Sequence, residues 1–250
     1  MCLIAWNWQP ESETPLLLLG NRDEYFARPA LPLHCWQDAE VLAGKDLQAG
    51  GTWLGIGRGS RLAALTNYRM PVVDSAPKPS RGMLTTQFLQ GNTGARTYLE
   101  ALAPQTGAYN PFNLLLWDGE ELLGLESRNQ RIVTLKPGFG AVSNADFDTP
   151  WPKLLRLKSA LQRQCRLGQT TVEDLLPLLQ DRSKAAYAEL PDTGVPRNIE
   201  HMLSAAFVSS AAYGTRASSI LTLNRQRSFF FEQAYGAQGA LTATKHFFTI

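Results

Sequence analysis

The chain has few cysteines, no long apolar run and almost no net charge, and each scarcity excludes a class of protein. Its three cysteines, Cys2, Cys35 and Cys165, are odd in number and have no C-x-x-C spacing, so we expect neither a disulfide framework nor a metal site. The longest apolar candidate, Leu16 to Leu19, is far shorter than the roughly 18 residues that a membrane span requires. We therefore expect no membrane span.

The net charge of the chain gives no indication of a nucleic-acid partner. The 24 basic and 22 acidic side chains give a formal net charge of +2, which is not the excess of positive charge that is typical of a nucleic-acid-binding protein. No Lys or Arg precedes Arg22, whereas a secretory signal needs a basic start, and the cytoplasm is the expected compartment. Hydrophobic residues make up 44% of the chain, enough for a packed core, and we expect one domain over residues 1–250.

The order of predicted elements indicates an α+β fold. Strands are expected at both ends and in the middle of the chain, and helices in two central blocks, at about 80–90, 95–102, 152–166 and 172–179. Regular alternation of strand and helix is missing, which argues against a doubly wound parallel sheet. We expect a four-layer αββα sandwich of two mainly antiparallel sheets packed face to face.

The expected strands define where polar motifs lie. They cover residues 1–8, 16–19, 113–117, 121–126, 131–135, 140–142, 206–209, 217–223, 228–233 and 246–250, with a hairpin formed by 50–57 and 61–68. The strand Leu16 to Leu19 should end in a turn made by the polar cluster Asn21 to Glu24. Asn67 should lie near the end of the second hairpin strand.

Cys2 is the sharpest candidate for chemistry. Removal of Met1 would place a thiol and a free α-amine on one residue. Because a free amine has a pKa of about 7.7–8.0 and a thiol about 8.5, the amine can act as a base for the thiol near neutral pH. The alternative is that Cys2 is a small buried residue of the first strand. Position alone favours this second interpretation.

The polar cluster that follows gives Cys2 a chemical context. Charges at the end of a core strand are costly unless they are paired or used. Arg22 would lower the pKa of the thiol and hold a substrate carbonyl or carboxylate, and Asp23 would orient the α-amine and stabilise it once protonated. The alternative is a structural ion pair that closes a turn.

Several motifs together resemble one family. They are Met-Cys at the start, GNRDE at 20–24, GGTWLG at 50–55, SRG at 80–82, SNADFDTPWPK at 143–153 and TRASSILTL at 215–223. Spread over most of the chain, they resemble the NRDE family, also called the transport-and-Golgi-organisation family. The glycines of GGTWLG fit a turn with positive φ or a close approach of backbone to a ligand.

This resemblance implies the architecture of the N-terminal-nucleophile hydrolases, nearest to the penicillin V acylase and bile-salt hydrolase group. It also implies roles for individual residues. Matched by motif, the nucleophile is Cys2, the strand-end pair is Arg22 and Asp23, the oxyanion-hole amides are Asn67 and Asn144, and the late arginine is Arg216. Amide N–H groups aimed at a developing oxyanion are each worth about 2.7–4 kcal/mol when preorganised.

Aromatic residues gather near these motifs in sequence. Trp53 and Tyr68 are the ones we expect to bind substrate, although an ordinary place in the core is the more frequent use of such residues.

Two functions from different classes fit these observations. The first is an amidohydrolase-like enzyme that acts on the non-peptide C–N bonds of N-acyl amides and needs no cofactor. The alternative, also implied by the resemblance, is a non-catalytic protein that binds and traffics haem or an acylated metabolite such as a lipid or acyl-CoA. For haem, His34 and Cys35 in a loop after Pro32 are candidate axial ligands, or only surface residues. A scaffold with a relic site is a third interpretation.

Overall fold

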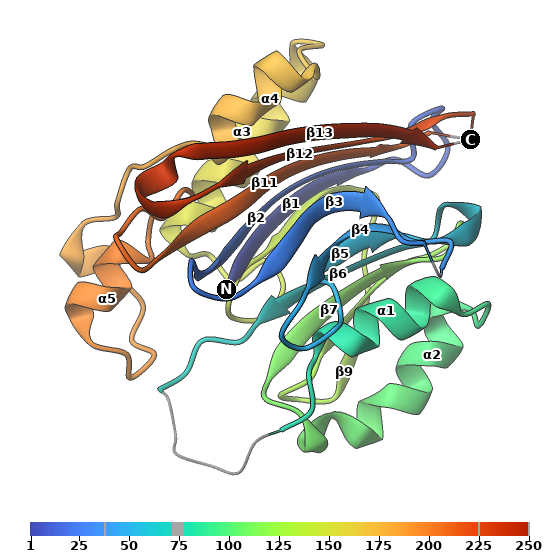
Figure 1. The fold of residues 1–250 in the computed structure, drawn as a ribbon, viewed down its shortest axis with the longest axis horizontal. Helices are drawn as coiled ribbons and strands as arrows, with labels where there is room; N and C mark the ends of the chain where they lie inside the picture. The colour runs from blue at the N-terminus through green and yellow to red at the C-terminus, as the bar shows by residue number, and fades with distance from the viewer. Residues whose placement is uncertain (38, 72–77, 225, 250) are drawn as a thin grey trace.

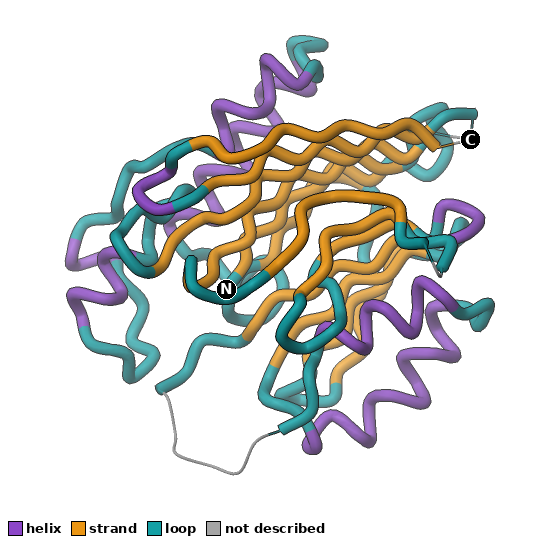
Figure 2. Tube along the Cα trace, in the orientation of Figure 1, coloured by secondary structure: helices purple, strands orange, loops and turns teal. Residues whose placement is uncertain are grey.

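The computed structural model describes residues 1–37, 39–71, 78–224 and 226–249. Two antiparallel sheets face each other, and helices cover their outer faces, as Figures 1 and 2 show. Helices α3 (Pro152–Arg166) and α4 (Val172–Leu179) pack on one sheet, and α1 (Gly82–Gln90) and α2 (Ala95–Leu102) pack on the other. The predicted α+β sandwich with an αββα layer order is confirmed.

The first sheet contains the N-terminal strand in an interior position. Its spatial order is β10 (Gly138–Val142), β1 (Cys2–Trp8), β2 (Leu16–Tyr25), β11 (Tyr213–Leu223), β12 (Ser228–Tyr235) and β13 (Leu241–Thr249). β1 therefore pairs on both sides, with β10 and β2, and this fixes the place of Cys2.

The second sheet is a meander in which every strand pairs with its neighbour in sequence. Its order is β3 (Ala30–Cys35), β4 (Leu42–Asp46), β5 (Leu54–Ile56), β6 (Leu62–Asn67), β7 (Phe112–Trp117), β8 (Leu122–Glu126) and β9 (Arg131–Thr134). Asn67 is the last residue of β6, as predicted. A short helix, α5 (Arg197–Met202), lies beside the sandwich, and 3-10 turns occur at 58–60, 103–108, 187–189 and 237–239.

Local sequence explains the helices that cover the first sheet. Pro152 occupies the first turn of α3, where its missing N–H has no acceptor to bond. Leu154, Leu157 and Leu161 recur at three- and four-residue steps, and all three are buried against the sheet. Thr171 caps α4, because its hydroxyl accepts a hydrogen bond from the Asp174 amide.

Alternation along β1 divides its side chains between two cores. Ile4 and Trp6 belong to the core between the sheets, whereas Leu3 and Ala5 belong to the core beneath α3 and α4. Because the period of a strand is two, Cys2 lies on the same face as Ile4 and Trp6. The thiol therefore points between the two sheets.

The prediction that the second strand ends before the polar cluster is wrong. β2 continues to Tyr25, so residues 21–24 are strand and not turn. The reason is that this segment pairs on both edges: Arg22 lies opposite Cys2 in β1, and Asp23 lies opposite Thr215 in β11. Two partner strands outweigh the local preference of Asn and Asp for turns.

Three further expectations differ from the structure. Residues 206–209 form no strand; the segment begins in a bend, where the Ala206 carbonyl accepts a hydrogen bond from Asn21. His34 and Cys35 belong to β3, not to a loop, because β3 pairs with β4 despite its Pro32. The last strand begins at Leu241 rather than at residue 246, and Ile250 lies outside the described residues.

Candidate functional site

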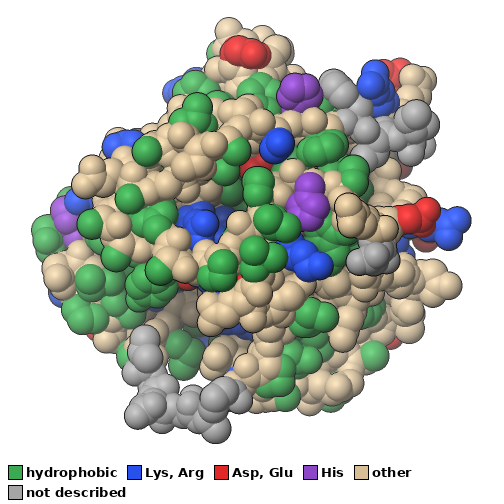
Figure 3. Space-filling model, viewed as in Figure 1, with side chains coloured by type: hydrophobic (Ala, Val, Ile, Leu, Met, Phe, Trp, Pro, Cys, Tyr) green, Lys and Arg blue, Asp and Glu red, His purple; other side chains and the backbone are tan. Residues whose placement is uncertain are grey.

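A cavity of about 670 Å³ lies between the two sheets, and Cys2 is one of the residues that line it. Both sheets contribute to its wall: β1, β2, β11, β12 and β13 from the first, β3, β4 and the end of β6 from the second, together with the start of α1. Cationic side chains lie among apolar ones where the sheets meet, as the space-filling view in Figure 3 shows. The cavity is thus positioned by the fold itself and not by one inserted loop.

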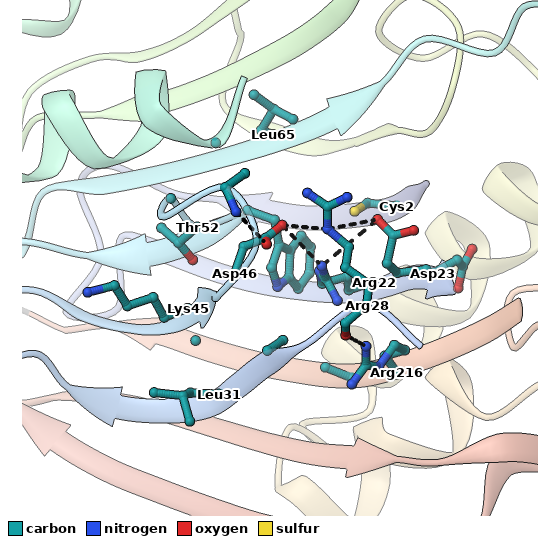
Figure 4. A pocket seen from close by; sticks show the side chains of 18 of the residues that line it. Cys2, Arg22, Asp23, Arg28, Leu31, Lys45, Asp46, Thr52, Leu65 and Arg216 are labelled. Carbon is teal, nitrogen blue, oxygen red and sulfur yellow. Dashed lines mark hydrogen bonds and ion pairs between the residues drawn. The ribbon is translucent and has the colours of Figure 1, made fainter. Parts of the chain in front are cut away.

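Cys2 and Arg22 are direct neighbours across the β1–β2 pair and face this cavity together. Figure 4 shows the side chains of Cys2, Arg22 and Arg28 in this part of the cavity wall. Arg22 also lies 3.9 Å from a carboxylate oxygen of Glu24 and 3.9 Å from one of Asp46. Arg28 donates to the same Asp46 oxygen at 2.7 Å. The arginine beside the thiol is therefore partly neutralised by two carboxylates.

Burial dominates the electrostatics of Cys2. It raises the pKa of the thiol to about 11, while the α-amine of Met1 and the Arg22 guanidinium act in the opposite direction. Arg22 thus favours the thiolate, as we expected from the sequence, but its effect is smaller than that of desolvation. With Met1 in place, the Cys2 thiol is protonated at neutral pH.

Met1 is half-buried, and its α-amine lies near the thiol. Its α-ammonium donates to the Asp23 carbonyl and, at 3.0 Å, to the Tyr213 hydroxyl. Burial lowers the pKa of this amine, and Cys2 and Asp23 oppose that shift. The pocket at the start of β1 therefore already accommodates one α-amine.

Asp23 points to the other side of the sheet from Arg22. Successive side chains of a strand face opposite sides, and Figure 4 shows the Asp23 carboxylate turned away from the Arg22 guanidinium. Asp23 is 1% exposed, and its Oδ1 accepts a 2.7 Å hydrogen bond from the Thr215 hydroxyl. Burial raises the pKa of Asp23, while Lys153, the α-amine and Thr215 lower it.

The two candidate oxyanion amides lie side by side but have different surroundings. Asn144 is fully buried and donates to the Asn67 carbonyl at 2.8 Å and to the Cys2 carbonyl at 3.4 Å. Its oxygen accepts from Arg69 at 3.3 Å and from Ser143 at 3.2 Å. Asn67 lines the cavity, and among the described residues its side chain has no hydrogen-bond partner. Of the two asparagines, Asn67 is the one that lines the cavity.

Arg216 and Trp53 also line the cavity. Arg216 lies at an irregularity of β11 between Thr215 and Ala217, and donates to the Tyr25 carbonyl at 3.1 Å and to the Arg28 carbonyl. The indole of Trp53 packs on Gly20, where an added Cβ would lie 3.0 Å from the ring.

Tyr68 is not brought to Cys2. It lines a second cavity with Arg69 and Trp151, and the Arg128 guanidinium lies 5.3 Å from the centre of its ring. Tyr68 directly follows Asn67 in the chain, so the two side chains diverge.

Two glycine motifs meet beside the cavity. Gly50 has φ of +83°, the turn conformation that we expected of this pair. Gly51 approaches backbone and not a ligand: an added Cβ would lie 2.3 Å from the carbonyl carbon of Gly82. Trp53 lies two residues after Gly51, and Arg81 directly precedes Gly82. The close packing of these two glycines therefore places Trp53 and Arg81 at the cavity wall.

Two site residues were missed from the sequence, Arg81 and Lys153. Arg81 lines the cavity and donates to the Pro111 carbonyl at 3.0 Å; burial lowers its pKa and Cys2 opposes the shift. Lys153 is 2% exposed near Asp23, although charged residues at a helix start are usually solvated. Both lie in motifs that carry the family resemblance, Arg81 in SRG and Lys153 in WPK. Membership of these motifs is the sequence feature that could have identified them as site residues.

The described residues contain no group of three or more His, Cys, Asp or Glu side chains that could hold a metal ion. In the same part of the chain, no helix is long and apolar enough to cross a membrane. The residues that line the Cys2 cavity include no histidine: His34 lies on β3 with its ring bonded to the Pro32 carbonyl, and Cys35 is exposed beside it.

Comparison with solved structures shows what this fold is similar to. A conjugated bile acid hydrolase from Clostridium perfringens, solved as its C2A mutant, superposes with a TM-score of 0.57 at 10% identity, covering 99% of this chain and 92% of that chain. A Caenorhabditis elegans orthologue of N-acylethanolamine-hydrolyzing acid amidase gives 0.51 at 10% identity, covering 88% and 92%. The fold is thus that of the N-terminal-nucleophile hydrolases.

Sequence comparison identifies the family. The human (Homo sapiens) Transport and Golgi organization protein 2 homolog is 32% identical over 246 residues, covering 90% of this chain and 89% of that protein. The Bos taurus homolog is 34% identical over 247 residues with the same coverage, and the Drosophila melanogaster protein is 27% identical over 269 residues. The family profile described as Transport and Golgi organisation 2 matches residues 1–237. The chain therefore belongs to the Transport and Golgi organisation 2 family.

Proposed function

We propose that this chain is a cysteine amidohydrolase that cleaves non-peptide C–N bonds of N-acyl amides after Met1 has been removed. The observation that carries the proposal is the position of Cys2, which lies on the first strand, lines the cavity and is directly opposite Arg22. The fold agrees with it, since the two structural neighbours are named as a hydrolase and an amidase, and the first was solved with the cysteine at its position 2 replaced.

The chemistry follows from one residue that carries both nucleophile and base. The thiol of Cys2 attacks the substrate carbonyl carbon, and the α-amine of Cys2 accepts the thiol proton. Collapse of the tetrahedral intermediate breaks the C–N bond, and the amine proton passes to the leaving nitrogen. Water then attacks the thioester and releases the carboxylic acid, which restores the thiol.

Other residues of the site act on charge and position. Asn67, which lines the cavity, can donate to the oxyanion, and Arg22 and Arg216 anchor the substrate. Asn144 holds the carbonyls of Cys2 and Asn67 in place through its own amide. Asp23 stabilises the α-amine when it is protonated.

Met1 prevents this chemistry while it remains attached. The nitrogen of Cys2 is then an amide and cannot accept a proton, and the thiol has a pKa of about 11. The buried site now taken by the Met1 ammonium shows that an α-amine is tolerated beside Asp23 and Tyr213. Removal of Met1 is therefore the step that would create the base.

The test compares proteins with and without Met1. The second form is made by cleaving an N-terminal fusion so that Cys2 is the first residue, and both are confirmed by intact mass. Against a panel of N-acyl amides, the form that begins with Cys2 should be at least about 100-fold faster, the contribution of a general base. Cys2→Ala should abolish turnover, and Cys35→Ala should leave it unchanged because Cys35 is exposed and does not line the cavity.

A binding function is the second candidate, and the charge of the cavity favours it. Arg81 and Arg216 line the cavity, and neither has a carboxylate partner within 4.0 Å among the described residues. An anionic ligand such as haem or an acylated metabolite would neutralise them. The cavity offers haem no histidine, and burial keeps the Cys2 thiol protonated, so its fit for axial ligation is poor.

The same two protein forms decide between the candidates. Equal turnover with and without Met1, or hydrolysis that survives Cys2→Ala, would refute the enzyme mechanism. If neither form hydrolyses any amide, a saturable Soret shift on titration with haem at micromolar concentration would support the carrier, and Arg81→Ala should weaken it. Absence of both turnover and saturable binding would remove both candidates.

A further inference from the structure

Lys153 and Asp23 carry two buried atoms that lack partners on the same side of the first sheet. Lys153, in the first turn of α3, is 2% exposed, and its Nζ has no hydrogen-bond partner in the described part of the chain. The Oδ2 atom of Asp23 is also buried without a partner there. An unpaired buried charge is costly, so two at one place call for an explanation.

The two groups interact although they form no ion pair within 4.0 Å among the described residues. Lys153 is the nearby charge that lowers the pKa of Asp23 most, ahead of the α-amine. In return, Asp23 and Cys2 raise the pKa of Lys153, which burial and Arg69 lower to about 8. Lys153 therefore lies within electrostatic reach of the carboxylate and of the thiol.

Other charged groups around the pair are already paired. Arg69, which follows β6, forms a buried ion pair with Glu200 of α5. Tyr213 and Thr215 of β11 bond the Asp23 carbonyl and its Oδ1, respectively. Among the described residues, this cluster leaves three buried polar atoms without a hydrogen-bond partner: Oδ2 of Asp23, Nζ of Lys153 and Nε of Arg69, whose guanidinium is nevertheless paired with Glu200.

A stabilising role in α3 does not account for Lys153. A cation in the first turn of a helix opposes the helix dipole, whose positive end lies there. Lys158 of the same helix shows the ordinary alternative, since it reaches the surface and pairs with Asp148 at 2.7 Å. Burial of Lys153 beside Asp23 must therefore be explained at the site.

We propose that Lys153 is a positioning residue that keeps Asp23 ionised in its buried place, so that Asp23 can stabilise the protonated α-amine of Cys2. The inference rests on the proposed function. When the thiol proton moves to the α-amine, a new positive charge forms beside Asp23, and only an ionised carboxylate can balance it. Lys153 takes no proton from substrate and touches no reacting atom.

The experiment measures the ionisation of Asp23 directly, in the full chain that begins with Cys2. The carboxyl carbon of Asp23 is followed by NMR against pH after ¹³C-aspartate labelling, and its resonance is assigned by its loss in Asp23→Asn. Lys153→Met should raise the pKa of Asp23 by at least about one unit, the usual effect of one nearby charge. The acidic limb of Cys2 alkylation by iodoacetamide should move upwards with it.

Matched variants separate this role from helix packing. Lys158→Met, which removes a charge from the same helix at the surface, should leave the pKa of Asp23 unchanged. Lys153→Arg keeps the charge and should restore the acidic limb. An unchanged pKa of Asp23 in Lys153→Met, or alkylation that slows equally at every pH, would overturn the proposal.

A measurement on the unmodified chain covers the case in which Lys153→Met fails to fold. Burial lowers the pKa of Lys153 to about 8, so the Asp23 resonance should show a second inflection as Lys153 loses its charge, and a resonance that shows one inflection only up to pH 11 would equally refute the proposal. If Lys153→Met shifts the pKa of Asp23 but the natural chain hydrolyses no amide, the role of Lys153 in keeping Asp23 ionised is supported. Only the proposed hydrolase function is then contradicted.

Discussion

At the scale of the residue, the polar cluster Asn21 to Glu24 serves both sides of one sheet. Arg22 faces the cavity between the sheets, while Asn21 and Asp23 face the helices and are buried there. This separation requires strand geometry, because a turn would not alternate the side chains in this way. One short motif thus supplies a charge beside the thiol, a carboxylate behind it and a structural amide.

Burial of Cys2 leads to a prediction about thiol reactivity. In protein that retains Met1, iodoacetamide at pH 7 should label exposed Cys35 well before Cys2. A rise in thiol pKa from 9.0 to about 11 reduces the thiolate fraction of Cys2 about 100-fold, and burial slows access further. Peptide mass spectrometry over time measures both rates. Cys2 labelled first in this form would contradict the electrostatic account, and Arg22→Ala should slow Cys2 further.

At the scale of the element, Asn21 ties β2 to the end of α4 and to the bend before β11. Its amide donates to the Leu179 carbonyl at 2.7 Å and to the Ala206 carbonyl at 2.8 Å. Its oxygen accepts from the Ser218 hydroxyl at 2.7 Å. All of these groups are buried, so the Asn21 side chain adds three hydrogen bonds to the strand pairing that holds β2, and with it Arg22 and Asp23, in place.

Loss of this side chain should destabilise the fold strongly. Asn21→Ala leaves two buried carbonyls and one hydroxyl without a partner, and we expect it to lower the free energy of unfolding by roughly 2–4 kcal/mol. Ser218→Ala removes only one of the three bonds and should cost about 1 kcal/mol. Urea unfolding of both variants measures the difference. Equal losses in the two variants would show that the two carbonyl bonds of Asn21 contribute little.

The sequence predicts the elements that depend on nearby residues, and it fails for those that depend on contacts with residues far away in the chain. Helix α3 and the hairpin that ends at Asn67 follow from apolar periodicity and turn residues over a few positions. The extension of β2 and the pairing of β3 depend on partner strands elsewhere in the chain. For the site, motifs identify residue types but not faces: Asn67 and Tyr68 are adjacent yet line different cavities. Lys153 meets Asp23 only through folding.

At the scale of the whole molecule, Glu232 joins the two sheets at the cavity wall. It belongs to β12 of the first sheet, and its Oε1 accepts a 2.7 Å hydrogen bond from the Leu33 amide in β3 of the second. Burial raises the pKa of Glu232 to about 7, against the opposing effects of that amide and of Arg22. The two halves of the sandwich are therefore held at this point by a carboxyl group that titrates near neutral pH.

The raised pKa of Glu232 makes stability depend on pH with a definite sign. Between its ordinary value of 4.5 and about 7, the folded chain binds this proton and the unfolded chain does not, so its contribution to stability is present at low pH and is lost as pH rises towards 7. The loss amounts to at most about 3 kcal/mol for such a shift. Glu232→Gln keeps an acceptor for the Leu33 amide without the charge, and should be more stable than the natural chain at pH 8 but not at pH 5.

Urea unfolding at several pH values between 5 and 8 measures this difference between the two proteins. Glu126→Gln is the matched control, because Glu126 is also buried but pairs with Arg131 at 2.6 Å. Its replacement removes a favourable charge and should lower stability at pH 8. If the difference in the free energy of unfolding between Glu232→Gln and the natural chain were constant over this range, Glu232 would not titrate between pH 5 and 8. Its burial at the cavity wall would then not raise its pKa to about 7.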